Sequence, residues 1–141
     1  MSDQTIIDGI TARLPPYARS LGMFVAALDN GAPVIAYDFD GRVAGRPGFL
    51  HGGAMAGLLE IAAIAALRTR IDAGDMPQKL KPVNISVEFM RGGKEERTYA
   101  VGEIIRLGRR VANVEARAWQ GDPAKPIATA FMNFLLSPAE G

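Results

Sequence analysis

The chain has 141 residues, contains no cysteine and carries a formal net charge of +1 at pH 7, with 48% hydrophobic residues. This length and composition predict one globular domain. The lack of cysteine excludes a disulfide framework, a cysteine nucleophile and a cysteine-ligated zinc site, and the near-neutral charge argues against a nucleic-acid partner. The N-terminus shows no basic segment leading into an apolar one, so we expect a cytoplasmic protein without a signal peptide.

The first residues, from about residue 3 to residue 14, predict a short amphipathic helix. Ser2 or Asp3 can cap its N-terminus, and the pair Pro15-Pro16 ends it. Its apolar face consists of Ile6, Ile7, Ile10 and Leu14.

Two strands are predicted next, over Leu21–Leu28 and Pro33–Phe39. The turn Asp29-Asn30-Gly31 joins them, so we expect them to pair antiparallel. The glycine-rich loop Asp40–Leu50 then leads to the most apolar part of the chain.

A long helix is predicted from Gly53 to about Ile71. Only Gly57 and Glu60 interrupt the apolar run Ala54–Leu67, and a helix that is apolar on every side belongs in a protein interior. The run is too short for a membrane span and contains a carboxylate, so no membrane partner is expected.

Four further strands are predicted after this helix, separated by turn-forming glycines and prolines. They are expected over 83–89, 99–107, 111–119 and 127–136. The order of elements is typical of an α+β fold, in which one long antiparallel sheet wraps around a central apolar helix. The last of these strands is apolar on both faces, which suits a strand that is covered on both sides.

The central helix carries two features that indicate chemistry. Gly52 and Gly53 at its start leave the backbone open to close approach, and the N–H groups of the first turn can bind an anion or an oxyanion. Glu60, nine residues after His51, is the one acid on this apolar helix. Because an unpaired buried carboxylate is costly, Glu60 is expected to find a partner, for example at a subunit contact, to take up a proton, or to face a cleft.

The motif His51-Gly52-Gly53, followed by Glu60 and then by four strands, resembles the PaaI-like branch of the hotdog-fold acyl-CoA thioesterases, over roughly residues 20–136. The resemblance implies the hotdog fold and hydrolysis of an acyl-CoA to free acid and CoA. It implies Glu60 as general base or nucleophile, the Gly52 N–H as oxyanion donor, and His51 as a residue beside the thioester carbonyl. Gly53 belongs to the same substrate-binding turn.

The chain departs from this family at two positions. Many relatives carry Asn or Gln about six residues before the histidine, where this chain has Gly45, and some place Thr or Ser one turn after the acid, where it has Ile64. These departures favour an alternative function, a non-catalytic acyl-CoA-binding or regulatory module. A hydratase on the same fold ranks last, because the single histidine lies at the oxyanion end of the helix.

Coenzyme A enters as part of the substrate, and no other cofactor and no metal are expected. Guanidinium groups bind phosphate well, so arginines at two turns are candidates for its phosphates, although each of them can equally be a solvated turn residue. They are Arg106, Arg109 and Arg110 at one turn and Arg91 at the other. The resemblance also implies a homodimer or a tetramer built from dimers, with the active site at the subunit boundary.

Overall fold

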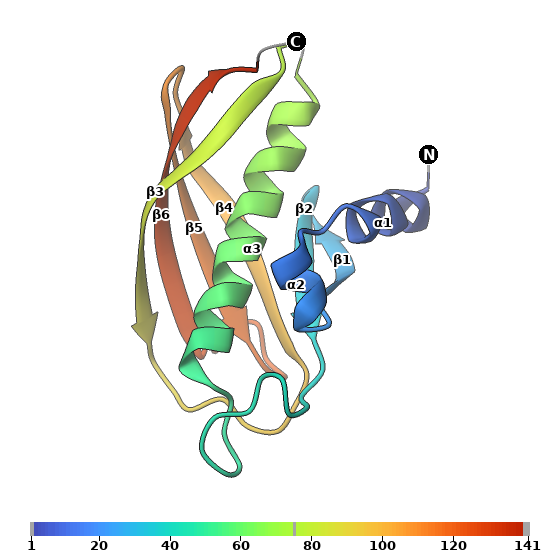
Figure 1. Ribbon diagram of the computed structural model, residues 1–141, viewed down its shortest axis with the longest axis vertical. Coiled ribbons are helices and arrows are strands. Elements are labelled where there is room, and N and C mark those ends of the chain that lie inside the picture. Colours follow the sequence, from blue (N-terminus) through green and yellow to red (C-terminus); the bar gives the residue numbers. More distant parts are fainter. Residues whose placement is uncertain (1, 75, 140–141) are drawn as a thin grey trace.

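The computed structural model describes residues 2–74 and 76–139 and shows a six-stranded antiparallel sheet wrapped around one long helix (Figure 1). The elements in chain order are α1 (Asp3–Ala12), α2 (Pro16–Ser20), β1 (Phe24–Asp29), β2 (Ala32–Tyr37), α3 (Gly52–Asp72), β3 (Gln78–Phe89), β4 (Thr98–Leu107), β5 (Val111–Trp119) and β6 (Ala128–Pro138). The α+β hotdog architecture predicted from the sequence is confirmed.

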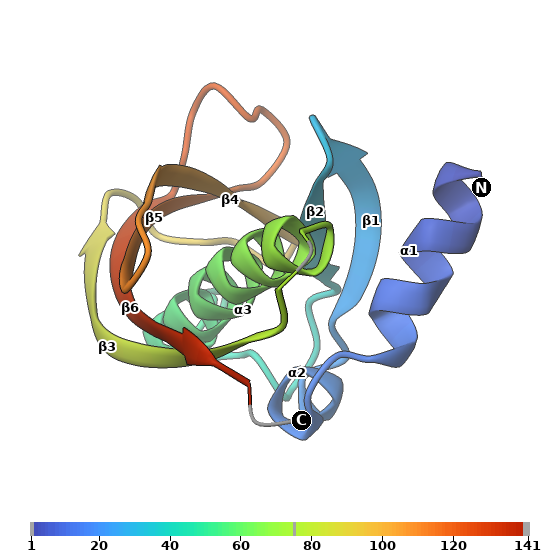
Figure 2. The ribbon, with the colours of Figure 1, turned by 90° about the horizontal axis from the view of Figure 1, so that it is seen from above.

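The strands follow the order β1-β2-β4-β5-β6-β3, so β1 and β3 form the two edges of the sheet. Seen from above, the sheet curves around α3, while α1 lies beyond β1 on the side away from β3 (Figure 2). The loop before α3 lies at one end of the molecule, and the β4–β5 turn lies at the other (Figure 1). Among the described residues, no helix combines the length and apolar character that crossing a bilayer requires.

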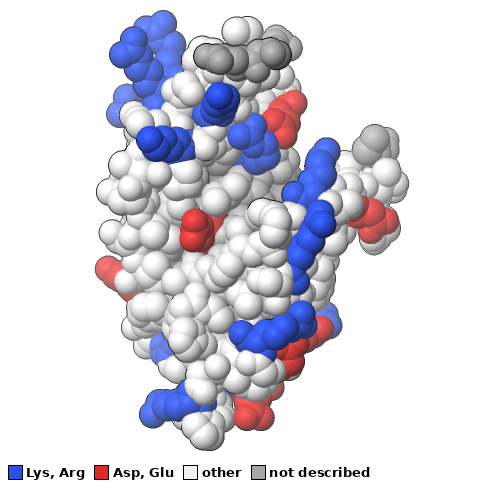
Figure 3. All heavy atoms as spheres, in the orientation of Figure 1, with Lys and Arg blue, Asp and Glu red and all other residues white. Residues whose placement is uncertain are grey.

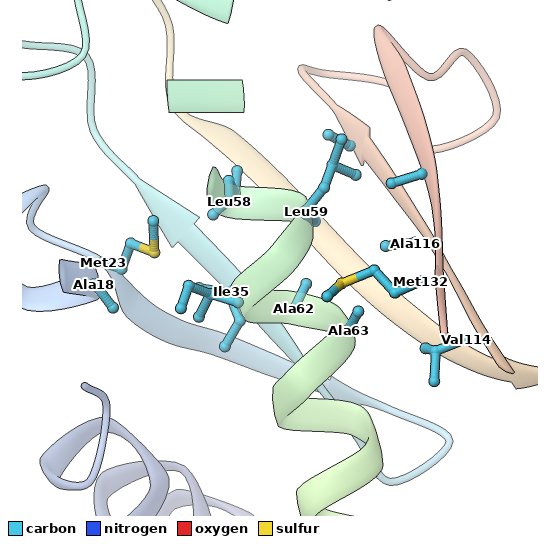
Figure 4. Packing of buried hydrophobic residues seen from close by; sticks show 14 of the residues in the cluster. Ala18, Met23, Ile35, Leu58, Leu59, Ala62, Ala63, Val114, Ala116 and Met132 are labelled. Carbon is cyan, nitrogen blue, oxygen red and sulfur yellow. The ribbon is translucent and has the colours of Figure 1, made fainter. Parts of the chain in front are cut away.

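The hydrophobic core lies between α3 and the concave face of the sheet (Figure 4). Leu58, Leu59 and Ala62 of α3 are fully buried there. Every second residue of a core strand points toward these side chains, because side chains alternate between the two faces of a sheet. Those labelled in the figure are Ile35, Val114, Ala116 and Met132.

The N-terminal region differs from the prediction because it contains a second helix. α2 precedes the predicted first strand, and the turn at Gly22, where φ is +72°, lies at its start, so β1 begins at Phe24 and not at Leu21. The following turn has φ of +50° at Asn30 and +84° at Gly31, as in the two-residue turns that match the twist of a hairpin.

Strand β3 is longer than the predicted 83–89. β3 begins at Gln78 and pairs with β6 along its length. Pro82 has no N–H to donate to the neighbouring strand, and the pairing register shifts at a bulge between Pro82 and Asn84. On β6 the outward-facing Phe131 and Leu135 are 55% and 47% exposed in the single chain. Cover on both faces of β6 therefore stays a prediction about assembly.

Helix α3 approaches β4 very closely at Gly102. A β-carbon at this position would lie 2.8 Å from the Ala62 carbonyl oxygen and 2.9 Å from the Ala66 β-carbon. The backbones can come this near only because one side contributes glycine and the other alanine, as expected for an interior packed at crystal-like density.

We expect Gly102→Ala to lower the free energy of unfolding by about 1–3 kcal/mol, because the added methyl group must push α3 away from the sheet. Gly9→Ala is the matched control, since a β-carbon at Gly9 in α1 meets nothing within 4 Å. The control should keep or slightly raise stability, because alanine favours a helix. Chemical denaturation measures both variants, and equal stabilities would contradict this account of the packing.

Candidate active site

The N-terminus of α3 is held in place by the loop before it. His51 is the N-cap residue, with φ −70° and ψ 132°, and its N–H donates to the Val43 carbonyl at 2.8 Å. The N–H of Leu50 donates to the Gly93 carbonyl at 2.9 Å, which ties the loop to the β3–β4 connection. The His51 carbonyl accepts from the N–H of Met55 at 3.1 Å, so the N–H groups of Gly52 and Gly53 precede the helical ladder.

The two glycines at this N-terminus have different surroundings. A β-carbon at Gly53 would lie 2.7 Å from Cε1 and 2.9 Å from Nδ1 of His51, so the imidazole occupies the space that Gly53 leaves. A β-carbon at Gly52 would lie at an ordinary 3.6 Å from the Phe89 ring. Gly53 therefore makes room for the exposed His51 side chain, a role that the sequence motif does not reveal.

A shallow recess of about 420 Å³ opens beside Gly52. Its other lining residues are Met55, Phe89, Met90, Arg91 and Gly92. The structure thus brings together two predicted site residues, Gly52 and Arg91, that are far apart in the sequence.

Glu60 lies on α3 with its side chain partly buried. Among the described residues, neither the ion pairs nor the side-chain hydrogen bonds include it. The surface over the middle of α3 is mostly uncharged, while basic side chains gather toward the ends of this face and beside α1, which itself contains no Lys or Arg (Figure 3). A partly desolvated carboxylate in such surroundings is suited to bind water or a reacting group.

Glu60 and Gly52 do not meet within one chain. Eight residues separate them, which corresponds to about 12 Å along a helix. A single carbonyl group cannot contact both the carboxylate of Glu60 and the N–H of Gly52 of the same chain.

The predicted arginines are divided between the two ends of the sheet. The carbonyl of Arg110 accepts from the N–H of Leu136, near the end of β6. Gly52 lies next to Phe89, which pairs with Ala128 at the start of β6. Within one chain, the turn with Arg106, Arg109 and Arg110 is therefore remote from the N-terminus of α3.

Two further cations lie near that N-terminus. Arg46 and Lys94 both lie over the Phe49 ring, at 3.9 and 4.4 Å from its centroid, and Phe49 also contacts Gly92 beside Arg91. The sequence places Lys94 next to the turn at Gly92-Gly93, but it gives no signal that Arg46 belongs to the same group.

Gln120 fixes the backbone that carries Lys94. Its side chain accepts from the Lys94 N–H at 2.9 Å and donates to the Lys94 carbonyl at 3.1 Å. It also donates to the hydroxyl of the buried Thr98 at 2.9 Å. Lys94 therefore projects from an ordered loop rather than from a loosely held turn.

Comparison with known proteins identifies the family. Residues 47–127 match the model of the thioesterase superfamily. The chain belongs to the thioesterase superfamily. The matched region includes the α3 N-terminus, Glu60, the β3–β4 connection and the β4–β5 turn, so the resemblance inferred from the sequence motif is confirmed.

Individual relatives of this thioesterase-superfamily chain agree with the assignment. The medium/long-chain acyl-CoA thioesterase YigI of Escherichia coli strain K12 is 28% identical over 109 residues, which cover 69% of this chain and 70% of the relative. A solved structure of a protein from Chromobacterium violaceum is 32% identical, covers 98% of this chain and 94% of its own, and has a TM-score of 0.72. The phenylacetic acid degradation protein PaaI from Thermus thermophilus, in a mutant structure, has the same TM-score at 22% identity, with 86% of this chain and 98% of its own covered.

Proposed function

We propose that this protein is an acyl-CoA thioesterase. The observation that carries the proposal is Glu60, a partly buried carboxylate on an apolar helix, with no hydrogen bond or ion pair among the described residues. Membership in the thioesterase superfamily and the similarity to an acyl-CoA thioesterase support thioester hydrolysis.

Glu60 acts on the thioester carbonyl in one of two ways. As a general base it takes a proton from water, whose oxygen bonds to the carbonyl carbon; as a nucleophile it bonds to that carbon itself, and water then releases the acid. In both cases the carbon–sulfur bond breaks and the sulfur leaves as the CoA thiol. The N–H of Gly52 donates to the oxyanion, and His51 lies at the same helix end.

The reacting carbonyl is shared between two chains in this proposal. The 12 Å or so between Gly52 and Glu60 along the helix prevents one chain from supplying both groups to one carbonyl. The edge strand β3 supports a second copy, because its hydrophobic residues Val83, Ile85 and Phe89 are 55%, 37% and 56% exposed. Two copies joined antiparallel along β3 form a homodimer, from which a tetramer can be built.

The acyl group of the proposed substrate is apolar. A groove of about 570 Å³ lies between α1 and α3, and Ile64, one turn after Glu60, is among its lining residues. Ile6, Ile10 and Ile61 also line it, and Arg68, Thr69 and Asp72 are among its polar lining residues. The Escherichia coli relative is named for medium and long acyl chains, which agrees with a lining of this kind.

A second candidate function, binding of acyl-CoA without turnover, is favoured by one feature of the loop. A β-carbon at Gly45 would lie 3.0 Å from the Cα of His51, so the backbone here is fitted to glycine and not to a longer polar residue. A screen of thiol release over short, medium, long and aromatic acyl-CoAs separates the two functions.

We expect Glu60→Gln to reduce thiol release by about 10²–10⁴-fold, the usual contribution of a positioned base. Acyl-CoA binding should persist, and the melting temperature should hold or rise, because a neutral amide replaces a desolvated charge. Glu103→Gln changes an exposed acid on β4 and is the matched control. Full activity in a well-folded Glu60→Gln protein would end the catalytic assignment.

Mixing two inactive variants tests the shared site. Gly52→Pro removes the N–H at the first helical position, where proline is tolerated, and the extended His51 is compatible with a following proline. If Glu60 and Gly52 act across two chains, co-refolding Gly52→Pro with Glu60→Gln should restore about a quarter of the wild-type activity, since half of the random dimers carry one intact site. If light scattering shows that the mixture forms dimers and the mixture is still inactive, the site lies within one chain.

Paired charge deletions test which cations bind the CoA phosphates. Arg91→Ala with Lys94→Ala should raise KM by about 10-fold or more with little change in kcat, and the effect should shrink at high salt. Arg109→Ala with Arg110→Ala removes the same charge from the other end of the sheet. An unchanged KM in this second pair would make those two arginines ordinary turn residues.

A further inference from the structure

Tyr17 reaches the surface of α3 at Gly57. Its hydroxyl oxygen occupies the place where residue 57 would carry a β-carbon, so the contact exists only because residue 57 is glycine. Gly57 is buried, whereas Tyr17 is 47% exposed. One end of the tyrosine ring thus touches the helix backbone while the rest borders solvent.

This contact places the Tyr17 hydroxyl next to Glu60. Gly57 and Glu60 are three residues apart on α3, and side chains at that spacing lie on the same face with about 5–6 Å between β-carbons. From residue 56 to residue 64, every α3 residue other than Glu60 is apolar or glycine. The helix itself therefore offers no second polar side chain within one turn of the carboxylate.

A second phenol lies near Tyr17. Tyr37 of β2 is fully buried, and its hydroxyl has no hydrogen-bond partner among the described residues. Burial raises the pKa of Tyr37, and the nearby Tyr17 raises it further. Since buried hydroxyl groups are nearly always hydrogen-bonded, this unpaired group indicates that a ligand or a water molecule belongs at this place.

Tyr17 is held in a fixed position by α2. The guanidinium of Arg19 donates to the Ala12 carbonyl at 2.5 Å, and Ala18 is fully buried. The Ser20 hydroxyl donates to the carbonyl of Tyr17 at 2.6 Å. A group held in this way can orient a reactant without first being ordered.

We propose that the Tyr17 hydroxyl, with the buried Tyr37 hydroxyl nearby, holds the water molecule that reacts beside Glu60. The inference rests on the proposed function and adds a polar side chain to a site where the helix supplies only Glu60. The water donates its proton to the Glu60 carboxylate while its oxygen bonds to the acyl carbon, and Glu60 passes the proton to the leaving sulfur. When Glu60 is the nucleophile, the same water cleaves the acyl-enzyme and its oxygen enters the free acid.

Two variants of different kinds test this inference on the full-length protein. Tyr17→Phe removes the hydroxyl and keeps the ring, and it should lower kcat by about 3- to 30-fold with KM and melting temperature unchanged. Gly57→Ala keeps the hydroxyl but displaces it by occupying its place, and it should cause a similar loss while alanine supports the helix. The double variant should lose no more than either single variant, because both remove the same interaction.

Tyr99→Phe is the matched control. Tyr99 stacks on Trp119 at 5.7 Å between ring centroids and packs in a hydrophobic cluster separate from the main core. The kcat of the Tyr99→Phe variant should therefore equal that of the wild type. An unchanged kcat in Tyr17→Phe, a loss that merely follows a lower folded fraction, or additive losses in the double variant would each overturn the inference.

The Glu60→Gln protein separates this inference from the proposed function. If Glu60→Gln abolishes thiol release and Tyr17→Phe does not reduce it, the inference fails and the thioesterase assignment stands. If the wild-type protein releases no thiol from any acyl-CoA, both are wrong.

Discussion

The close contact between α3 and β4 determines how the central helix lies on the sheet. Glycine at position 102 and alanines on the facing turns of α3 let the helix lie directly on the sheet, where dispersion contacts act over many atom pairs. That contact determines which face of α3 is buried, and hence which face is left for chemistry. Glu60 lies on the remaining face, and the helix N-terminus lies at one end of the sheet beside Phe89.

The same geometry separates the groups that the proposed reaction uses, the N–H of Gly52 and the carboxylate of Glu60. A straight helix cannot bring its own N-terminus to a carboxylate two turns away, so a fold built on one central helix favours a site shared by two copies. The exposed hydrophobic residues of β3 are consistent with such sharing, since a long uncovered edge strand is otherwise an aggregation hazard. In the proposed dimer, assembly and catalysis would depend on the same edge of the sheet.

The sequence predicted the main elements because their signals are local. A nearly unbroken apolar run located the long helix, alternation located the later strands, and turn residues located most of the breaks. It missed α2, since a five-residue helix that starts at Pro16 has no periodicity to detect. It also missed the clamp on Lys94, because Gln120 lies 26 residues away along the chain. The motif identified Gly53 as open backbone, whereas only side-chain packing shows that His51 fills that space.

Gly57 is a clear example of a residue whose meaning depends on another part of the chain. Read within the helix alone, it is a weak point, because glycine lowers helix stability relative to alanine by about 1 kcal/mol. The N-terminal segment explains why glycine stands at position 57. A β-carbon there would exclude the Tyr17 hydroxyl from the helix surface. The helices before the sheet thus do more than cover the core: they bring a polar group to a helix face whose own residues around Glu60 are apolar.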